Sequence, residues 1–386
     1  MPLSVSKRSE CVLQSEIRNM SIECDKVHGL NLSQGICDMK VPLQVAKSAD
    51  EGIRKGFNTY TRYDGIERLR NAISNQLKTF RGINADPNSE IIVSAGSTGA
   101  FYCACLALLD QGDEIILFQP YYGYHLSTIK AAGCKAKYVT LEPPDWTFSE
   151  SDFKKIITKK TKGIMINTPA NPSGKVFSRK EIELICDLAK KHDMFVFTDE
   201  IYEHFVYDGH KHVSPVSING MKERTITISG YSKTFSITGW RIGYAYCDSK
   251  WAKMLGYFND LIYVCAPAPL QYAVARGIES LTKKYYLDLC GKYKAKRDKI
   301  CDSLNDAGLR PFIPNGSYYV LADVSKIPGK SSKEKSMRLL KDTGVASVPG
   351  EAFYNGNDGE NIARFCYAKE DSILDEACSR LRKINK

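Results

Sequence analysis

Lys233 and Arg241 stand in the segment SKTFSITGWRIGY (residues 232–244), which follows a short apolar run. A lysine amine can form an imine with an aldehyde, and a guanidinium can bind a phosphate. Each residue alone has a simpler explanation, because most basic side chains lie on the solvated surface of a protein. The segment becomes informative only together with groups from other parts of the sequence.

Gly96, Ser97 and Thr98 follow the apolar run EIIVSA and open a stretch of helical type. The free N–H groups and the positive dipole end of a helix N-terminus suit a phosphate. The turn has neither GxGxxG nor GxxxxGK spacing, which argues against a dinucleotide or a nucleoside triphosphate. A glycine-rich turn between a strand and a helix can also be purely structural.

Asp199 ends the apolar run MFVFTD, and Tyr202 follows three residues later. A carboxylate buried there needs a cation, although a helix cap or an internal ion pair would also explain it. Tyr122 and Asn171 follow two further runs, where rim packing and an Asx turn are the ordinary explanations. Together, the anion cradle, carboxylate, phenol, amide, aromatic ring and amine fit a flat, phosphorylated, pyridine-type aldehyde.

Seven short apolar or β-branched runs predict the strands that must position these groups. The runs cover residues 90–96, 113–120, 135–141, 163–169, 194–200, 225–232 and 241–247. Segments of helical type separate most of them, which favours parallel pairs, but only residues 233–240 precede the last run, so that strand should be antiparallel. We therefore predict an α/β fold with a seven-stranded mixed, mostly parallel sheet flanked by helices, and ligand groups at the carboxyl ends of its strands.

The chain changes character near residue 276, where a long charged helical stretch begins. Two short strand-like pieces follow, near residues 317–324 and 362–367. We predict a smaller α+β domain built from both chain ends. The expected division is an N-terminal segment (1–49) packing with the small domain, a large cofactor-binding domain (50–275) and a small C-terminal domain (276–386).

The composition is that of a globular protein, with 43% hydrophobic and 25% charged residues among 386. Thirteen cysteines without a CxxC pair indicate free thiols, and neither a signal-peptide pattern nor a long apolar run occurs, so we expect a cytoplasmic protein outside the membrane. The net charge of +10 is spread along the chain, which argues against nucleic-acid binding. His210 and His212 stand in a polar turn, and we expect no metal there.

These motifs resemble those of the fold-type I pyridoxal-phosphate enzymes, class I/II aminotransferase group. The resemblance extends from NLSQG (31–35) to ARFCYA (363–368) and is most specific in SKTFSITGWRIGY. It implies pyridoxal 5'-phosphate as cofactor and a transaminase of the EC 2.6.1 type, which moves an amino group between an L-amino acid and a 2-oxo acid in two half-reactions. It also implies a homodimer with shared active sites.

The resemblance implies a role for each matching residue. Lys233 would hold the cofactor as an internal aldimine, and Asp199 would pair with the pyridine nitrogen. Tyr202 and Asn171 would donate to the ring oxygen, and Tyr122 would stack on the ring. The phosphate would be bound by Gly96, Ser97, Thr98, Ser232 and Arg241, and by Tyr60 of the neighbouring subunit. The residues Arg364, Gly35 and Asn171 would bind the substrate, with Arg364 on its α-carboxylate.

Some alternatives stay open at this stage. A C–S (β-elimination) lyase would use the same lysine and aspartate, and a cofactor-dependent transcription regulator would need a DNA-binding domain that about thirty residues before NLSQG cannot supply. Aspartate, alanine, aromatic amino acids and kynurenine-like compounds are all open as substrates. Arg62 is a candidate second cation for a dicarboxylate, but an ordinary exposed arginine is the favoured explanation. Whether Ser229 or Gly230 contributes to phosphate binding also stays open.

Overall fold

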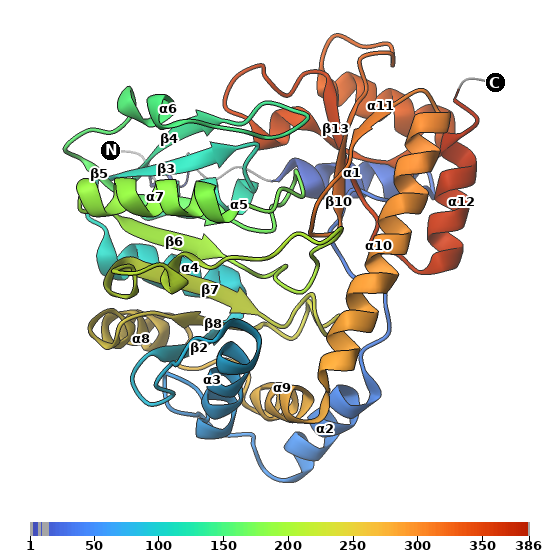
Figure 1. Cartoon of the computed structure of the whole chain (residues 1–386). Helices are drawn as coiled ribbons and strands as arrows, with labels where there is room; N and C mark the ends of the chain where they lie inside the picture. Colours follow the sequence, from blue (N-terminus) through green and yellow to red (C-terminus); the bar gives the residue numbers. More distant parts are fainter. Residues whose placement is uncertain (1–2, 7–8, 10–14, 385–386) are drawn as a thin grey trace.

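The computed structural model describes residues 3–6, 9 and 15–384, and Figure 1 shows its arrangement. A seven-stranded sheet forms the larger part. Its order is β2 (Ile91–Ala95), β8 (Ile242–Tyr246), β7 (Thr225–Gly230), β6 (Phe195–Asp199), β5 (Thr161–Asn167), β3 (Glu114–Gln119) and β4 (Lys135–Thr140). β8 pairs antiparallel with both of its neighbours, and the other pairs are parallel. The predicted mixed, mostly parallel sheet is confirmed.

Helices cover both faces of this sheet because its central strands are apolar on both sides. On β5, Ile164 and Ile166 pack in a cluster with α7 (Arg179–Lys191), whereas Met165 packs on the other face with α4 (Gly96–Leu108) and α8 (Ser249–Tyr263). Figure 1 shows α7 in front of the sheet and α4 and α8 behind it. Two shorter helices, α5 (Gly123–Ala131) and α6 (Glu150–Lys154), complete the crossovers.

A second, four-stranded antiparallel sheet lies beside the first. Its order is β12 (Val348–Pro349), β13 (Ile362–Cys366), β10 (Tyr319–Asp323) and β9 (Arg310–Phe312). The two predicted strand-like pieces correspond to β10 and β13, whereas β9 and β12 have only two or three residues and give no alternating pattern. The helices of this part are α10 (Lys283–Asp306), α11 (Ser332–Thr343) and α12 (Asp371–Leu381).

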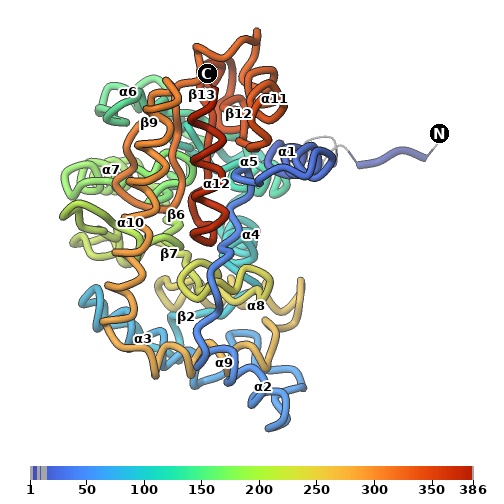
Figure 2. Tube along the Cα trace, turned by 90° about the vertical axis from the view of Figure 1, so that its right-hand side faces the viewer, coloured from blue at the N-terminus to red at the C-terminus, as the bar shows by residue number. Residues whose placement is uncertain are grey.

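The N-terminal part of the chain contacts both regions. Helix α1 (Glu16–Lys26) packs on β11 (Val345–Ala346) and β12, and β1 (Leu30–Asn31) pairs in parallel with β11. The chain then runs along the molecule to α2 (Leu43–Arg54), which packs on α9 (Ala268–Ser280) beside α3 (Glu67–Arg81), as Figure 2 shows. The domain boundaries given above stay a prediction.

The charged stretch that begins near residue 276 is two helices rather than one. Helix α9 ends at Ser280, and α10 begins at Lys283 after Thr282, whose backbone is extended. The break has a packing reason: α9 contacts α2 and α3, whereas α10 contacts α12 and β9. The orange helix α10 in Figure 1 therefore connects the two regions of the molecule.

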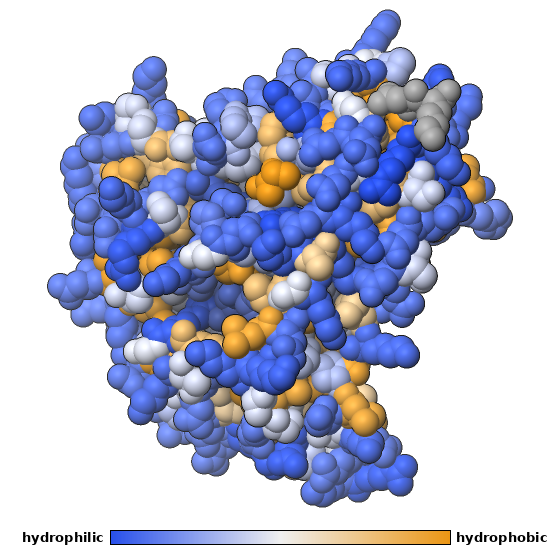
Figure 3. Space-filling view, turned by 45° about the vertical axis from the view of Figure 1, so that its right-hand side comes forward, coloured by the Kyte–Doolittle hydropathy of each residue, from blue (hydrophilic) through white to orange (hydrophobic). Residues whose placement is uncertain are grey.

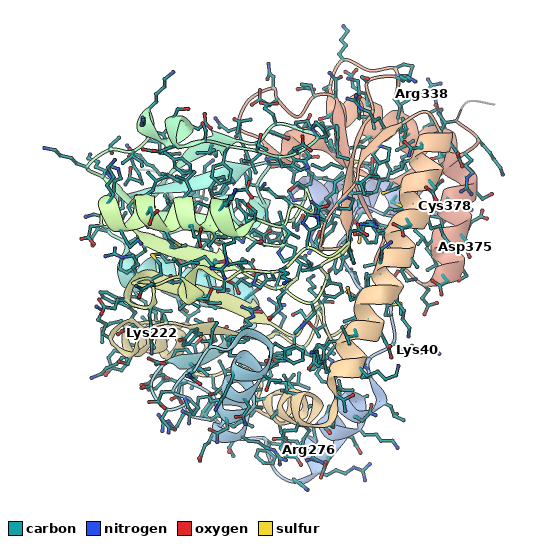
Figure 4. All side chains as sticks on the ribbon, viewed as in Figure 1. Lys40, Lys222, Arg276, Arg338, Asp375 and Cys378 are labelled. Atoms are coloured by element: carbon teal, nitrogen blue, oxygen red, sulfur yellow. The ribbon has the colours of Figure 1, made fainter. Side chains whose placement is uncertain are left out.

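The outer surface is polar. The face drawn in Figure 3 is mainly hydrophilic, with apolar residues in small separate groups. Charged residues labelled in Figure 4, including Arg276, Arg338 and Asp375, lie on different elements at the periphery. Among the described residues, no helix is both long and apolar enough to cross a membrane.

Strand β8 passes very close to the first turn of α4. A Cβ on Gly243 would lie 2.5 Å from the carbonyl carbon of Gly96 and 2.5 Å from the nitrogen of Ser97. Both atoms belong to the backbone and cannot rotate away, so only glycine fits. This contact fixes where the N-terminus of α4 meets the end of the sheet.

We expect Gly243→Ala to lower the free energy of unfolding by about 1–3 kcal/mol, because the added methyl group overpacks this contact. Thermal unfolding followed by circular dichroism measures the effect. Gly291→Ala is the matched control, since that glycine lies exposed in α10 with no heavy atom within 4 Å of the new Cβ. The control should gain about 0.5–1 kcal/mol from helix propensity. Equal stability of the two variants would contradict the contact's importance.

Candidate active site

A cavity of about 440 Å³ lies at the carboxyl ends of the parallel strands. Its lining includes every predicted site residue except Gly96 and Tyr60. Those that line it are Gly35, Ser97, Thr98, Tyr122, Asn171, Asp199, Tyr202, Ser232, Lys233, Arg241 and Arg364. The structure therefore brings groups that are far apart in the sequence into one enclosed space.

The two exceptions have different positions. Gly96 lies directly behind the cavity, where a Cβ would be 2.3 Å from Nη2 of Arg241, so the missing side chain makes room for the guanidinium. Tyr60 is 82% exposed and lies outside the cavity of its own chain.

The amine of Lys233 is buried at the base of the cavity. Its Nζ donates to the carbonyl oxygen of Gly35 at 3.1 Å, and the hydroxyl of Tyr318 donates to the same oxygen at 3.0 Å. Burial lowers the pKa of Lys233 below its ordinary value, although Cys37 and Cys366 act in the opposite direction. A larger fraction of this amine is therefore neutral, and hence nucleophilic, than for a surface lysine.

Asp199 is held in a defined orientation at the end of β6. Its Oδ2 lies 3.0 Å from Nε2 of His125, and its Oδ1 accepts from the backbone N–H of Ile201 at 3.2 Å. The sequence analysis did not identify His125. The spacing could have revealed it, because His125 stands three residues after Tyr122 and a helical turn places both on one side of α5.

Two phenols and an amide form one wall. Tyr202 and Tyr319 lie with their hydroxyl oxygens 3.2 Å apart, and burial, followed by the proximity of Tyr319, raises the pKa of Tyr202 well above its ordinary value. Tyr202 therefore stays protonated and can donate a hydrogen bond. Asn171 accepts from Arg364 through Oδ1, so its amide nitrogen is the donor that remains. Asn167, also missed, fixes this strand end by accepting from the backbone of Asn171 at 2.7 Å.

Arg364 is a fully buried cation that forms no ion pair with a carboxylate of the described residues. Its Nη1 donates to Asn171 Oδ1 at 2.8 Å and its Nη2 to the carbonyl oxygen of Ser33 at 2.5 Å, while Nε has no partner among the described residues. Its guanidinium carbon lies 4.3 Å from the ring centroid of Tyr319. Because a buried charge needs a counter-charge, this arrangement points to an anionic ligand.

A second anion site lies at the first turn of α4. The N-cap residue Ala95 offers no side-chain cap, so the first N–H groups of the helix are free of side-chain partners. Ser97, Thr98 and Ser232 add hydroxyl groups. Arg241 adopts a left-handed backbone conformation with φ +57°, which is unusual for an arginine and typical of functional sites, and its Nη1 donates to the carbonyl oxygen of Thr238 at 3.0 Å.

This donor set fits pyridoxal 5'-phosphate. The phosphate has an uncapped helix N-terminus and a guanidinium, the ring nitrogen has a buried carboxylate, and the aldehyde has a buried amine.

Ser229 does not belong to the set, because its hydroxyl donates to Glu203 at 3.2 Å behind the sheet end. Gly230 instead packs against the backbone of Gly243. Arg62 does not line the cavity and forms two hydrogen bonds with Asp64.

The remaining lining residues were not predicted from the sequence, and about half of them come from segments outside the repeating strand–helix pattern. They are Ser15, Ile17, Arg18, Gln34, Ile36, Tyr124, Asn167, Ile201, Thr238 and Tyr319. Three of them belong to the start of α1, which packs on β11 and β12. Nothing in the local sequence of α1 predicts that placement.

The family model for aminotransferase class I and II matches residues 27–381. The chain is 36% identical to an aspartate aminotransferase of Pyrococcus abyssi, covering 99% of this chain and 98% of that protein. It is 35% identical to kynurenine–oxoglutarate transaminase 3 of Rattus norvegicus, covering 92% and 85%. These proteins carry transaminase names and do not favour the lyase alternative.

Solved structures agree with these matches. The structure of N-succinyldiaminopimelate aminotransferase from Mycobacterium tuberculosis superposes with a TM-score of 0.95 at 30% identity, covering 99% of this chain and all of that one. An aromatic aminotransferase from Pyrococcus horikoshii superposes with a TM-score of 0.87 at 34% identity, covering 95% and 98%.

A buried charge network lies directly behind Asp199. Arg81, the last residue of α3, forms ion pairs with both Glu200 and Glu203. Nε2 of His212 lies 3.0 Å from Glu200 Oε2, and Ser214 donates to Glu200 Oε1 at 2.6 Å. Burial alone would raise the pKa of Glu200, but Arg81 and His212 outweigh it and lower that pKa to about 2. Among the described residues, no cluster of potential metal ligands occurs.

This network should make the protein sensitive to acid. A folded-state pKa of about 2, against 4.5 for an ordinary glutamate, means that the unfolded chain binds more protons between those values. Stability from Glu200 is therefore complete above about pH 4.5 and is lost as the pH falls toward 2. Burial also lowers the pKa of His204 to about 4, which adds a loss of stability between about pH 6.5 and 4.

We expect Glu200→Gln to lower the free energy of unfolding at pH 7 by roughly 3 kcal/mol, because Arg81 loses a buried counter-charge. The difference from the wild type should shrink below pH 4.5. Urea unfolding at pH 7 and pH 3 measures both values. Glu183→Gln, at a partly exposed carboxylate on α7, is the control and should change stability little. An identical loss of stability in wild type and Glu200→Gln on acidification would contradict the role of Glu200.

Proposed function

Because this chain belongs to the aminotransferase class I and II family and is a pyridoxal-phosphate-dependent aminotransferase, we propose that the cavity described above is its active site. The amino group would pass between an L-amino acid and a 2-oxo acid. The observation that carries this assignment is Arg364, a buried guanidinium that forms no ion pair among the described residues, in the same cavity as the amine of Lys233. One is suited to an α-carboxylate and the other to an aldehyde.

Different residues of the chain would hold different parts of the cofactor. Arg241, Ser232 and the first turn of α4, with Ser97 and Thr98, would hold the phosphate. Asp199 would keep a proton on the ring nitrogen, because an ionised carboxylate favours the cationic form of a neighbouring base. When bound, pyridoxal phosphate supplies the aldehyde that accepts the amino group and the ring that takes up the electrons of the broken Cα–H bond.

Lys233 would act on the substrate after it gives up the aldehyde carbon. Its neutral amine, favoured by the lowered pKa, would be placed to accept the proton from the substrate Cα and to return a proton within the same site. His125 would fix the orientation of Asp199 during this step.

Arg364 would set the pose of the substrate. Hydrogen bonds to Asn171 and to the carbonyl oxygen of Ser33 fix the orientation of its guanidinium. A fixed guanidinium orients a carboxylate, and orientation decides which bond at Cα stands ready to break. Tyr202 and the amide nitrogen of Asn171 would donate to the ring oxygen, and Tyr122 would stack on the ring.

We also propose that the protein is a homodimer with shared sites. Tyr60 is exposed in one chain, where it contacts no cavity of its own. A set of apolar side chains along α8 and just beyond it is exposed as well: Met254, Tyr257, Leu261, Ile262 and Val264. Such a concentration of apolar residues is typical of an interface.

The twelve cysteines of the described residues are free, which supports a cytoplasmic, reducing location.

Replacing Lys233 by alanine tests the assignment of the site. We expect Lys233→Ala to keep its far-ultraviolet circular dichroism, to lose detectable transamination and to lose the visible absorbance of the bound cofactor after dialysis. Lys284→Ala, at an exposed position of α10, is the control and should keep all three properties. Transamination by Lys233→Ala at the control rate would overturn the proposal.

The dimer is tested by placing a charge in the apolar set on α8. We expect the wild type to sediment at twice the chain mass of 43.2 kDa, and Leu261→Asp to shift toward the monomer because a buried carboxylate is costly. Analytical ultracentrifugation measures both. Leu287→Asp makes the same change at an exposed leucine of α10 and should stay dimeric. A monomeric wild type would contradict the shared site.

A further inference from the structure

One phenol in the cavity wall has no role in the proposed function. Tyr319, the first residue of β10, is buried and lines the cavity. Its hydroxyl oxygen lies 3.2 Å from that of Tyr202, which the proposed function makes a donor to the ring oxygen of the cofactor. The two phenols therefore form a hydrogen-bonded pair, of which only one has been given a task.

Close contacts fix the ring of Tyr319. The guanidinium carbon of Arg364 lies 4.3 Å from the ring centroid. On Gly35, a Cβ would lie 1.8 Å from the hydroxyl oxygen of Tyr319, so the phenol occupies space that only a glycine leaves free. Tyr319 also pairs with Cys366 across β10 and β13, the strand that carries Arg364. The hydroxyl of Tyr319 thus has a defined position beside Tyr202.

The direction of the hydrogen bond between the phenols follows from the number of protons. A phenol has a single proton to donate. If Tyr202 donates its proton to the ring oxygen, it can keep the hydrogen bond with Tyr319 only as an acceptor, and Tyr319 must be the donor. Burial raises the pKa of Tyr319, although the nearby Arg364 acts in the opposite direction, so Tyr319 keeps the proton that it has to donate.

A hydroxyl that accepts a hydrogen bond becomes a stronger donor. Its O–H bond is polarised, and each bond in such a chain strengthens the next by about 10–30%. Tyr319, Tyr202 and the ring oxygen would form a chain of this kind. The hydrogen bond from Tyr319 also restricts rotation of the Tyr202 hydroxyl, so that its proton points toward the cavity.

The other titratable groups around the two phenols stay the same when one hydroxyl is removed. Burial raises the pKa of two further phenols and of one thiol, so these groups stay neutral, and the remaining two are a guanidinium and a carboxylate. The five groups are Tyr122, Tyr318, Cys366, Arg364 and Asp199.

We propose that Tyr319 is a positioning residue, whose hydroxyl donates to Tyr202 and thereby directs and strengthens the hydrogen bond from Tyr202 to the ring oxygen. The inference rests on the proposed function, because it takes the role of Tyr202 as given. Tyr319 acts through Tyr202 and not on the cofactor or the substrate directly.

The visible absorbance of the holoenzyme, titrated with pH, tests the proposal without turnover. A weaker donor at the ring oxygen lets that oxygen hold a proton more tightly, so the midpoint of the absorbance change moves to higher pH. We expect Tyr319→Phe to raise the midpoint by about 0.2–0.6 pH units, and Tyr202→Phe to raise it further. Tyr367→Phe removes a buried hydroxyl that donates to Ser317 outside the cavity, and it should leave the midpoint unchanged.

A double variant tests whether Tyr319 acts through Tyr202. In the Tyr202→Phe background, Tyr319→Phe should move the midpoint by less than about 0.1 pH units, because no hydroxyl is left to accept its hydrogen bond. An unchanged midpoint in the single variant Tyr319→Phe would overturn the proposal. An equal shift in both backgrounds would also overturn it, because Tyr319 would then act on the cofactor directly.

Two comparisons separate this inference from its premise and from general damage to the site. If Tyr202→Phe has the midpoint of the wild type, the proposed role of Tyr202 fails; if it shifts but Tyr319→Phe does not, only the inference on Tyr319 fails. Tyr319→Phe keeps the ring beside Arg364, so its holoenzyme should bind butyrate, measured by isothermal titration calorimetry, within about twofold of the wild type. A larger loss would place the effect at the carboxylate site and contradict the proposal.

Discussion

The site depends on a positive charge that the protein buries without neutralising. Arg364 is held by oxygens that carry no formal charge, one from the side chain of Asn171 and one from the backbone of Ser33. These bonds fix the direction of the guanidinium but leave its charge unbalanced, so the cavity favours an anion over water. They also connect three distant parts of the chain: strand β13, the loop after β5 and the segment after β1.

The second anion site of the cavity is formed largely by backbone groups. The N-terminus of α4 has no side-chain cap, and two glycines let neighbouring groups approach it closely: Gly96 faces Arg241, and Gly243 lies against the turn itself. Between the two anion sites, the carboxylate of Asp199 is fixed by His125 and by a backbone N–H group. The cavity therefore combines two anion sites with one fixed carboxylate, a set of charges that suits a ligand with two acidic groups and a basic group.

The large sheet and most of the site could be predicted from the sequence because the runs that form the strands also mark where the site residues follow. Most strands are short apolar or β-branched runs, and the predicted site residue follows where the run stops, as at Asp199 and Asn171. The missed residues lack such a signal. His125 lies in the first turn of α5, Tyr319 lies in the second sheet, and Arg18 lies in α1, which packs on β11 and β12. Tertiary packing, rather than local pattern, places all three.

The carbonyl oxygen of Gly35 has two donors, the amine of Lys233 and the hydroxyl of Tyr318. If the amine moves away, the phenol still satisfies that oxygen, so the departure leaves no orphaned acceptor inside the protein. The hydrogen bond from Lys233 is therefore not needed to satisfy this carbonyl oxygen. In the role proposed for Lys233, the amine would leave this position in every cycle and could do so, and return, at little energetic cost.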